Sequence, residues 1–161
     1  MNNSYMRACC KVQEYNHNHI NSGCCCYFNE VDNTSVAQLR STTAQTLSAV
    51  NQLVTFNTSN SFRNATVAGE SITVNESGRY LINYGFNASA GQNSALSLYI
   101  NGVENASTRL TILGASGDLS SSIILNLNAG DVITMRVSAY TASVTLPADT
   151  LNAYITLTEA V

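Results

Sequence analysis

The chain has 161 residues, a formal net charge of −3, 45% hydrophobic residues and only 11% charged residues. This length and apolar content suit one folded domain with a real core, and they differ from a disordered chain, which combines few apolar residues with high net charge. The seven lysines and arginines are scattered, so we expect no nucleic-acid partner, and no segment approaches the roughly 20 apolar residues of a membrane span.

Residues 1–31 are a polar arm that holds every cysteine and both histidines of the chain. Its start, Met1–Tyr5, has no apolar h-region, so we predict no classical signal peptide. An odd number of cysteines in two tight clusters cannot be closed by intrachain bridges alone. The candidates for intersubunit disulfides are Cys9, Cys10, Cys24, Cys25 and Cys26.

A zinc site is the weaker alternative for this arm. Zinc takes four soft ligands, and the arm offers Cys10, His17, His19 and Cys24. Adjacent cysteines point poorly at one metal, and the usual Cys-x(2–4)-Cys spacing is missing. We therefore favour disulfides, with unreacted thiols as a third alternative, and predict no cofactor.

The end of the arm, Cys26–Val31, is a candidate for strand donation. An extended segment with alternating side chains can add to the sheet edge of a neighbouring subunit, and Tyr27, Phe28 and Val31 would dock it. A disordered tail is the equal alternative, because chain termini are often disordered.

Residues 32–46 are expected to be a linker. The residues Val36, Leu39, Thr43, Thr46, Val50 and Leu53 fall at the a and d spacing of a heptad repeat. The Ser and Thr content argues against a helix, so whether residues 35–53 are helix or strand stays open. We favour an irregular or short helical connector, followed by a first strand around Val50–Phe56.

Residues 47–161 read as one β domain. Alternating apolar residues predict strands over Arg79–Phe86, Ser94–Ile100, Ser120–Leu127, Val132–Ala139 and Leu151–Thr158. Asn101-Gly102 between two such runs is a strong hairpin signal, because both central residues of a type I′ turn need positive φ. Asn128–Asp131 is a second turn. This spacing of strands and turns predicts an antiparallel sandwich or barrel.

No enzyme active site is expected in this domain. It lacks histidine and cysteine after residue 31, so a Ser–His or Cys–His nucleophile pair cannot form within it. Its acidic residues include Glu76, Asp118 and Asp131, which lie beside glycines at expected turns, where carboxylates bond to the backbone.

Three segments resemble a known family. They are Val54–Thr58, Ile72–Ile82 with its Glu-Ser-Gly-Arg-Tyr-Leu-Ile ending, and Leu96–Val103; Leu127–Ile133 adds a fourth. Together they are similar to the C-terminal heads of bacterial exosporium collagen-like glycoproteins, which belong to the tumour necrosis factor-like and complement-head jelly-roll superfamily. The resemblance covers roughly residues 50–160. The chain departs from those glycoproteins because it has no collagen-like repeat and carries a Cys-rich arm, similar in composition to the connectors of spore-appendage pilins.

The resemblance implies an antiparallel jelly roll with an extended arm that packs as a homotrimer on the spore surface, in the exosporium or an appendage. We therefore expect a structural subunit that assembles with itself, and with other spore-coat or exosporium proteins as further candidates. The alternative is a trimeric ligand- or receptor-binding head on a spore or phage fibre. Candidates for core or trimer packing are Tyr80, Ile82, Tyr84, Phe86, Tyr99 and Tyr154.

Overall fold

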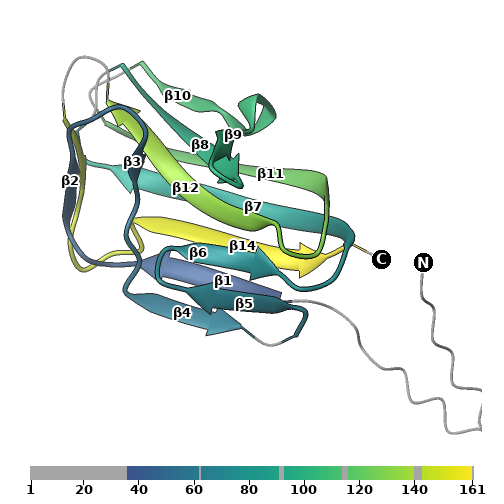
Figure 1. The fold of residues 1–161 in the computed structure, drawn as a ribbon. Coiled ribbons are helices and arrows are strands. Elements are labelled where there is room, and N and C mark those ends of the chain that lie inside the picture. Colours follow the sequence, from purple (N-terminus) through teal and green to yellow (C-terminus); the bar gives the residue numbers. More distant parts are fainter. Residues whose placement is uncertain (1–35, 62, 91–92, 114–115, 140–142, 161) are drawn as a thin grey trace, which may run out of the picture. The chain divides into compact units, whose positions relative to one another are not determined.

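The domain is built almost entirely from antiparallel strands. The computed structural model describes residues 36–61, 63–90, 93–113, 116–139 and 143–160. These residues form fourteen strands and one short 3-10 helix, η1 (Ala106–Thr108). Twelve of the strands lie in two stacked sheets, and the other two form a small separate pair (Figure 1). The prediction of an all-β antiparallel sandwich is confirmed. None of the helices in the described ranges is long and apolar enough to cross a membrane.

One layer is a five-stranded sheet in the order β11-β7-β14-β1-β4. Its strands are β11 (Gly117–Leu127), β7 (Gly78–Ala88), β14 (Ala153–Glu159), β1 (Val36–Ser41) and β4 (Thr58–Ser61). All of the pairings in this sheet are antiparallel, and β7 pairs along its whole length with β11.

The other layer has seven strands. Its main path is β10 (Leu110–Ile112), β8 (Ser94–Ile100), β12 (Val132–Ala139), β6 (Ser71–Val74) and β5 (Ala65–Ala68); β3 (Gln52–Leu53) pairs with β12, and β9 (Val103–Glu104) pairs with β8. A separate pair joins β2 (Gln45–Leu47) to β13 (Val144–Leu146).

The core lies between the two layers and follows from the period-2 pattern of the strands. Side chains of alternate residues point to opposite faces of a sheet. On β7 the inward set is Tyr80, Ile82, Tyr84 and Phe86, and these residues are at most 3% exposed. The neighbouring strand β14 adds three buried side chains to the same layer, Ala153, Ile155 and Leu157. The inward side chains of β12, in the other layer, are buried opposite them: Ile133, Met135 and Val137.

The N-terminal boundary differs from the expected one. Residues 36–41, expected in an irregular or short helical linker, form β1, which lies inside the five-stranded sheet between β14 and β4. Ala37 and Leu39 alternate and are fully buried. Chain contacts group Asn33–Val161 into one compact unit. The heptad-like spacing is therefore coincidental, because short runs of apolar residues fit both helical and strand periods.

The strands predicted at Val50–Phe56 and Leu151–Thr158 have different bounds in the structure. Only Gln52–Leu53 forms a strand within Val50–Phe56, and Val50 is 57% exposed. Leu151, expected to be buried, is 40% exposed because β14 begins at Ala153, and the side chain of Asn152 is buried before it.

Both predicted turns are present. Asn101 and Gly102 have φ of 53° and 81°, as a type I′ hairpin requires. In the second turn the amide of Asp131 donates to the carbonyl oxygen of Asn128 at 3.0 Å, and Gly130 takes the positive φ of 93°.

Candidate assembly surface

The five-stranded sheet has one face against the core and one face turned away from it, which we call the outward face. Its central residues are supplied by alternate positions of β1, β7, β11 and β14; those on β11 are exposed and the others are partly exposed. They are Gln38, Leu81, Asn83, Ser122, Ile124, Tyr154, Thr156 and Thr158.

Strand register arranges these side chains in rows across the sheet. Leu81 pairs with Ile124 on one side and with Thr158 on the other, which gives an apolar row. Asn83 pairs in the same way with Ser122 and Thr156, which gives a polar row. Ile124 is 51% exposed, so the apolar row is open to a partner.

The polar row is held together by its own hydrogen bonds. The Ser122 hydroxyl donates to Asn83 Oδ1 at 2.6 Å, and Gln38 Nε2 donates to Thr156 Oγ1 at 3.5 Å. The charged residues of this face lie outside these two rows. Arg79 and Asp118 are near the ends of β7 and β11, and Arg40 pairs with Tyr154 on one side and with Thr58 of β4 on the other. Two adjacent rows without charge suit a protein–protein contact, since interface cores are depleted of charged residues.

The packing residues predicted from the sequence lie in three places: the core, the outward face and, for Tyr99, the seven-stranded sheet. Tyr80, Ile82, Tyr84 and Phe86 lie in the core of a single chain, so core packing is the role that the structure gives them. Tyr154 lies on the outward face and is partly exposed.

The buried hydroxyl of Tyr84 ties the sheet to η1. It donates to the carbonyl oxygen of Thr108 at 2.7 Å. Burial raises the pKa of this hydroxyl, and a side-chain hydrogen bond with Ser121 partly opposes the shift. Thr108 Oγ1 in turn accepts from the Leu98 amide at 2.8 Å, which continues the link into the seven-stranded sheet.

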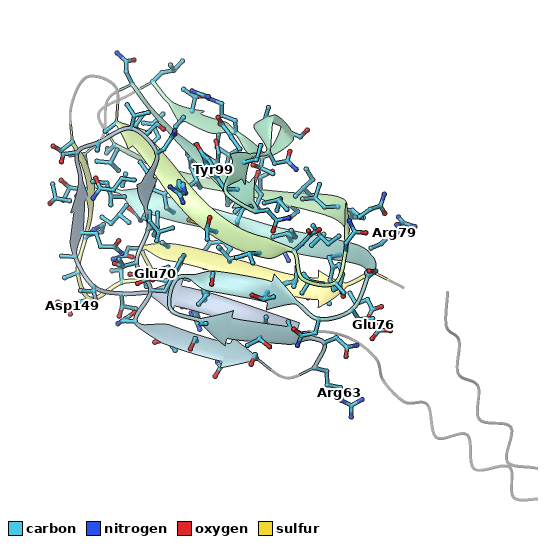
Figure 2. The ribbon with its side chains drawn as sticks, viewed as in Figure 1. Arg63, Glu70, Glu76, Arg79, Tyr99 and Asp149 are labelled. Carbon is cyan, nitrogen blue, oxygen red and sulfur yellow. The ribbon has the colours of Figure 1, made fainter. Side chains whose placement is uncertain are left out.

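Tyr99 lies on the outer side of the seven-stranded sheet, where Figure 2 labels it. Its hydroxyl donates to Asn51 Oδ1 at 2.6 Å, and the Ser138 hydroxyl donates to the same oxygen at 2.8 Å. The guanidinium carbon of Arg136 lies 5.1 Å from the centroid of the Tyr99 ring. Only 6% of Tyr99 is exposed, so this network braces a loop rather than presenting an aromatic contact surface.

Sequence reasoning missed most of the outward face. Asn83, Ser122 and Thr156 are polar residues that alternate with apolar ones, a pattern that ordinary solvent-facing strand positions share. The usable signal was the absence of charge from these alternate positions, because solvent-facing strand positions commonly carry charged side chains.

The cysteine arm lies outside the described residues. This holds for the disulfide candidates, for the strand-docking residues Tyr27, Phe28 and Val31, and for the alternative zinc ligands. Within the described ranges, no group of three or more His, Cys, Asp or Glu side chains is placed to hold a metal ion.

Solved structures share this fold at low sequence identity. Murine APRIL is 17% identical with a TM-score of 0.56, and the match covers 79% of this chain and 99% of that one. Eiger TNF from S. frugiperda is 14% identical with a TM-score of 0.53, covering 80% and 92%. Rabbit GITRL is 15% identical with a TM-score of 0.50, covering 79% and 94%. These likenesses establish the tumour necrosis factor-like jelly roll and nothing finer.

At the level of sequence, no curated protein matches the chain. The family model of the BclA C-terminal domain, however, matches residues 37–159, which begin in β1 and end with β14. The match covers the whole two-layer sandwich, and it confirms the resemblance to exosporium glycoprotein heads read from the sequence motifs. The chain belongs to the family of BclA C-terminal domains.

Proposed function

We propose that this protein is a non-enzymatic structural subunit of the bacterial spore surface, whose heads form homotrimers and whose arms join the heads through disulfides. The observation that carries the proposal is the pair of uncharged rows through Leu81 and Asn83 on the outward face of a domain of the BclA family. Its location in the exosporium or an appendage, and its contacts with other spore-coat proteins, rest on the family alone.

The trimer contact is assigned to the outward face for physical reasons. Its apolar row, Leu81 and Ile124 with Thr158, supplies area whose burial is favourable. Tyr154 adds an amphipathic ring, and Tyr is enriched in interface cores. The Asn83 row has paired side chains, so it enters an interface with part of its hydrogen-bonding capacity already satisfied.

Placing a charge in this face should abolish the trimer. Thr156→Arg puts a guanidinium at the centre of the sheet, where it would be buried in the trimer without a partner, at a cost of several kcal/mol. We expect sedimentation equilibrium to give the mass of three chains for the wild type and of one chain for the variant. Thermal melting of both proteins checks that the monomer is folded.

Val103→Arg is the matched control for that experiment. Val103 is 72% exposed on the β8–β9 hairpin of the other sheet, so a new charge there should leave the trimer intact. A wild-type domain that sediments as a monomer would contradict the proposal, and so would a Thr156→Arg variant that stays trimeric.

The arm is proposed to link heads covalently. Vicinal cysteines reach several neighbours at once, and the domain after residue 31 contains no cysteine that could compete. Non-reducing gels of the wild type should show a ladder of covalent multimers, which collapses to one monomer band when a reductant is added.

Replacing all five cysteines by serine should remove this ladder and leave the melting temperature of the domain unchanged. The serine variant and the reduced wild type should also look alike by electron microscopy, as separate heads instead of fibres or sheets. A monomer band for the wild type under both gel conditions would refute covalent linkage while leaving the trimer untouched.

A further inference from the structure

We propose that Asn101 is a latent deamidation site, and that a hydrogen bond to Asp131 slows its deamidation in the folded protein. Asn101-Gly102 is the single Asn-Gly step of the sequence, and asparagine followed by glycine is the dipeptide in which backbone attack on the side-chain amide meets least steric resistance. The protection comes from one side-chain contact, which we call the Asn101–Asp131 clasp.

Nothing shields this turn by bulk. Asn101 and Gly102 are exposed, and a Cβ built on Gly102 would have no atom within 4 Å. The chemistry needs only the side chain of Asn101 to swing back onto the Gly102 nitrogen.

The clasp holds the side chain in another direction. Asn101 Nδ2 donates to Asp131 Oδ1 at 2.7 Å, and Asn101 Oδ1 accepts from the Val132 amide at 2.9 Å. Both atoms of the side-chain amide therefore face the β11–β12 turn. The Asn101 backbone amide adds a third bond to that turn, to the Val132 carbonyl oxygen at 2.9 Å.

Asp131 is itself fixed, so it can act as a firm anchor. Its Oδ2 accepts from the Asn128 amide at 2.8 Å, and its carbonyl oxygen accepts from the Val74 amide at 2.9 Å. The Ser77 hydroxyl oxygen accepts from the Ala129 amide at 2.9 Å, which joins the turn marked by Glu76 in Figure 2 to the same end of the domain.

The reaction that the clasp prevents is fully defined. The Gly102 nitrogen attacks Asn101 Cγ, the new C–N bond closes a succinimide ring, and the Cγ–Nδ2 bond breaks. Nδ2 leaves as ammonia, taking the proton lost by the Gly102 amide. Water then opens the ring to aspartate or isoaspartate, so the sum is one amide and one water converted to one acid and ammonia.

Deamidation of Asn101 would remove the hydrogen bond to Asp131 that slows the reaction. A carboxylate at position 101 would place an anionic oxygen where Nδ2 now donates to the Asp131 carboxylate. Two carboxylates at this distance repel, and one of them is ionised with difficulty. Deamidation would therefore loosen this end of the sandwich, and the change would be irreversible.

The first test removes the anchor. Full-length wild type and Asp131→Ala are incubated in mildly alkaline buffer, and tandem mass spectrometry of the tryptic peptide that spans Asn101 follows conversion of the amide to acid. We expect Asp131→Ala to deamidate about tenfold faster than the wild type, the factor expected for loss of one charge-assisted hydrogen bond. Wild type unfolded in urea sets the upper limit of the rate.

Asp118→Ala is the control, since the Asp118 carboxylate is exposed on β11, on the opposite side of the sandwich core from the clasp hairpin. It should deamidate at the wild-type rate. Equal rates for Asp131→Ala and Asp118→Ala, or a native wild type that deamidates as fast as the unfolded chain, would overturn the proposal. Circular dichroism at the incubation temperature verifies that each variant is folded.

A second variant tests the consequence without removing Asp131. Asn101→Asp should melt below the wild type at neutral pH. Repulsion between the two carboxylates raises the pKa of one of them in the folded state, so stability should recover as the pH falls from neutral and be restored by about pH 4, the ordinary pKa of aspartate. Asn93→Asp, at another exposed turn position with positive φ, should lack this pH dependence. An Asn101→Asp protein as stable as the wild type at neutral pH would mean that the clasp does not hold this turn.

Discussion

A Gly85→Ala variant should lose about 2 to 3 kcal/mol of its free energy of unfolding, which is the cost of overpacking a rigid site. A Cβ built on Gly85 lies 2.5 Å from the Leu119 carbonyl oxygen and 3.0 Å from the Cα and Cβ of Ser120. These atoms are mainly backbone of β11, so no flexible side chain can move aside. The methyl group would have to push β11 away from β7, along which it pairs over eleven residues.

Gly117→Ala is the matched control for this prediction. Gly117 begins β11, and no atom lies within 4 Å of a Cβ built on it. Alanine also loses less backbone entropy on folding than glycine does, so this variant should stay within about 0.5 kcal/mol of the wild type. Denaturant unfolding followed by circular dichroism measures both variants. Equal stability of the two variants would mean that β7 and β11 do not approach each other so closely.

The sequence predicted the strands whose two faces differ in polarity. On β7 and β12 an apolar residue recurs at every second position, and the structure places all of the predicted inward residues of β7 in the core. The Asn101-Gly102 turn was equally readable, because a type I′ hairpin demands residues that accept positive φ. Local sequence determines these strands and this turn, so they could be predicted without knowledge of tertiary contacts.

The N-terminal strand could not be read in the same way. β1 contains only two apolar residues of described burial, Ala37 and Leu39, and a six-residue strand is too short to separate a period of 2 from a helical period. Its place between β14 and β4 depends on pairing with residues more than a hundred positions away. Such non-local pairing is invisible in the local pattern.

The absence of charge points to the candidate assembly surface, but the sequence could not show which side chains face outward, for a related reason. Tyr80 and Tyr154 are both tyrosines within predicted strands. Tyr80 is nevertheless buried in the core, whereas Tyr154 lies on the outward face. Which face of a strand meets the second layer is set by the stacking of the sheets. A sequence pattern gives the alternation and leaves that choice open.

An Asn152→Ala variant should lose about 2 to 3 kcal/mol of stability, because it removes two hydrogen bonds that a fully buried side chain donates. Asn152 is fully buried, and its Nδ2 donates to the Thr43 carbonyl oxygen at 2.8 Å and to the Pro147 carbonyl oxygen at 2.6 Å. One side chain thereby ties the loop after β1 to the loop before β14. Asp149, labelled in Figure 2, lies at this end of the domain, and its amide donates to the Thr42 carbonyl oxygen.

The order of three variants distinguishes this mechanism from simple loss of packing. Asn152→Asp keeps the volume but replaces the donor with an oxygen that faces two carbonyls, so it should be less stable than Asn152→Ala at neutral pH. Asn152 Oδ1 has no hydrogen-bond partner among the described residues, so truncation to alanine also removes an unsatisfied atom. Asn126→Ala, exposed on β11, should match the wild type. If Asn152→Asp proved more stable than Asn152→Ala, side-chain volume would be the contribution of Asn152, and the two loops would be held by their backbone bonds alone.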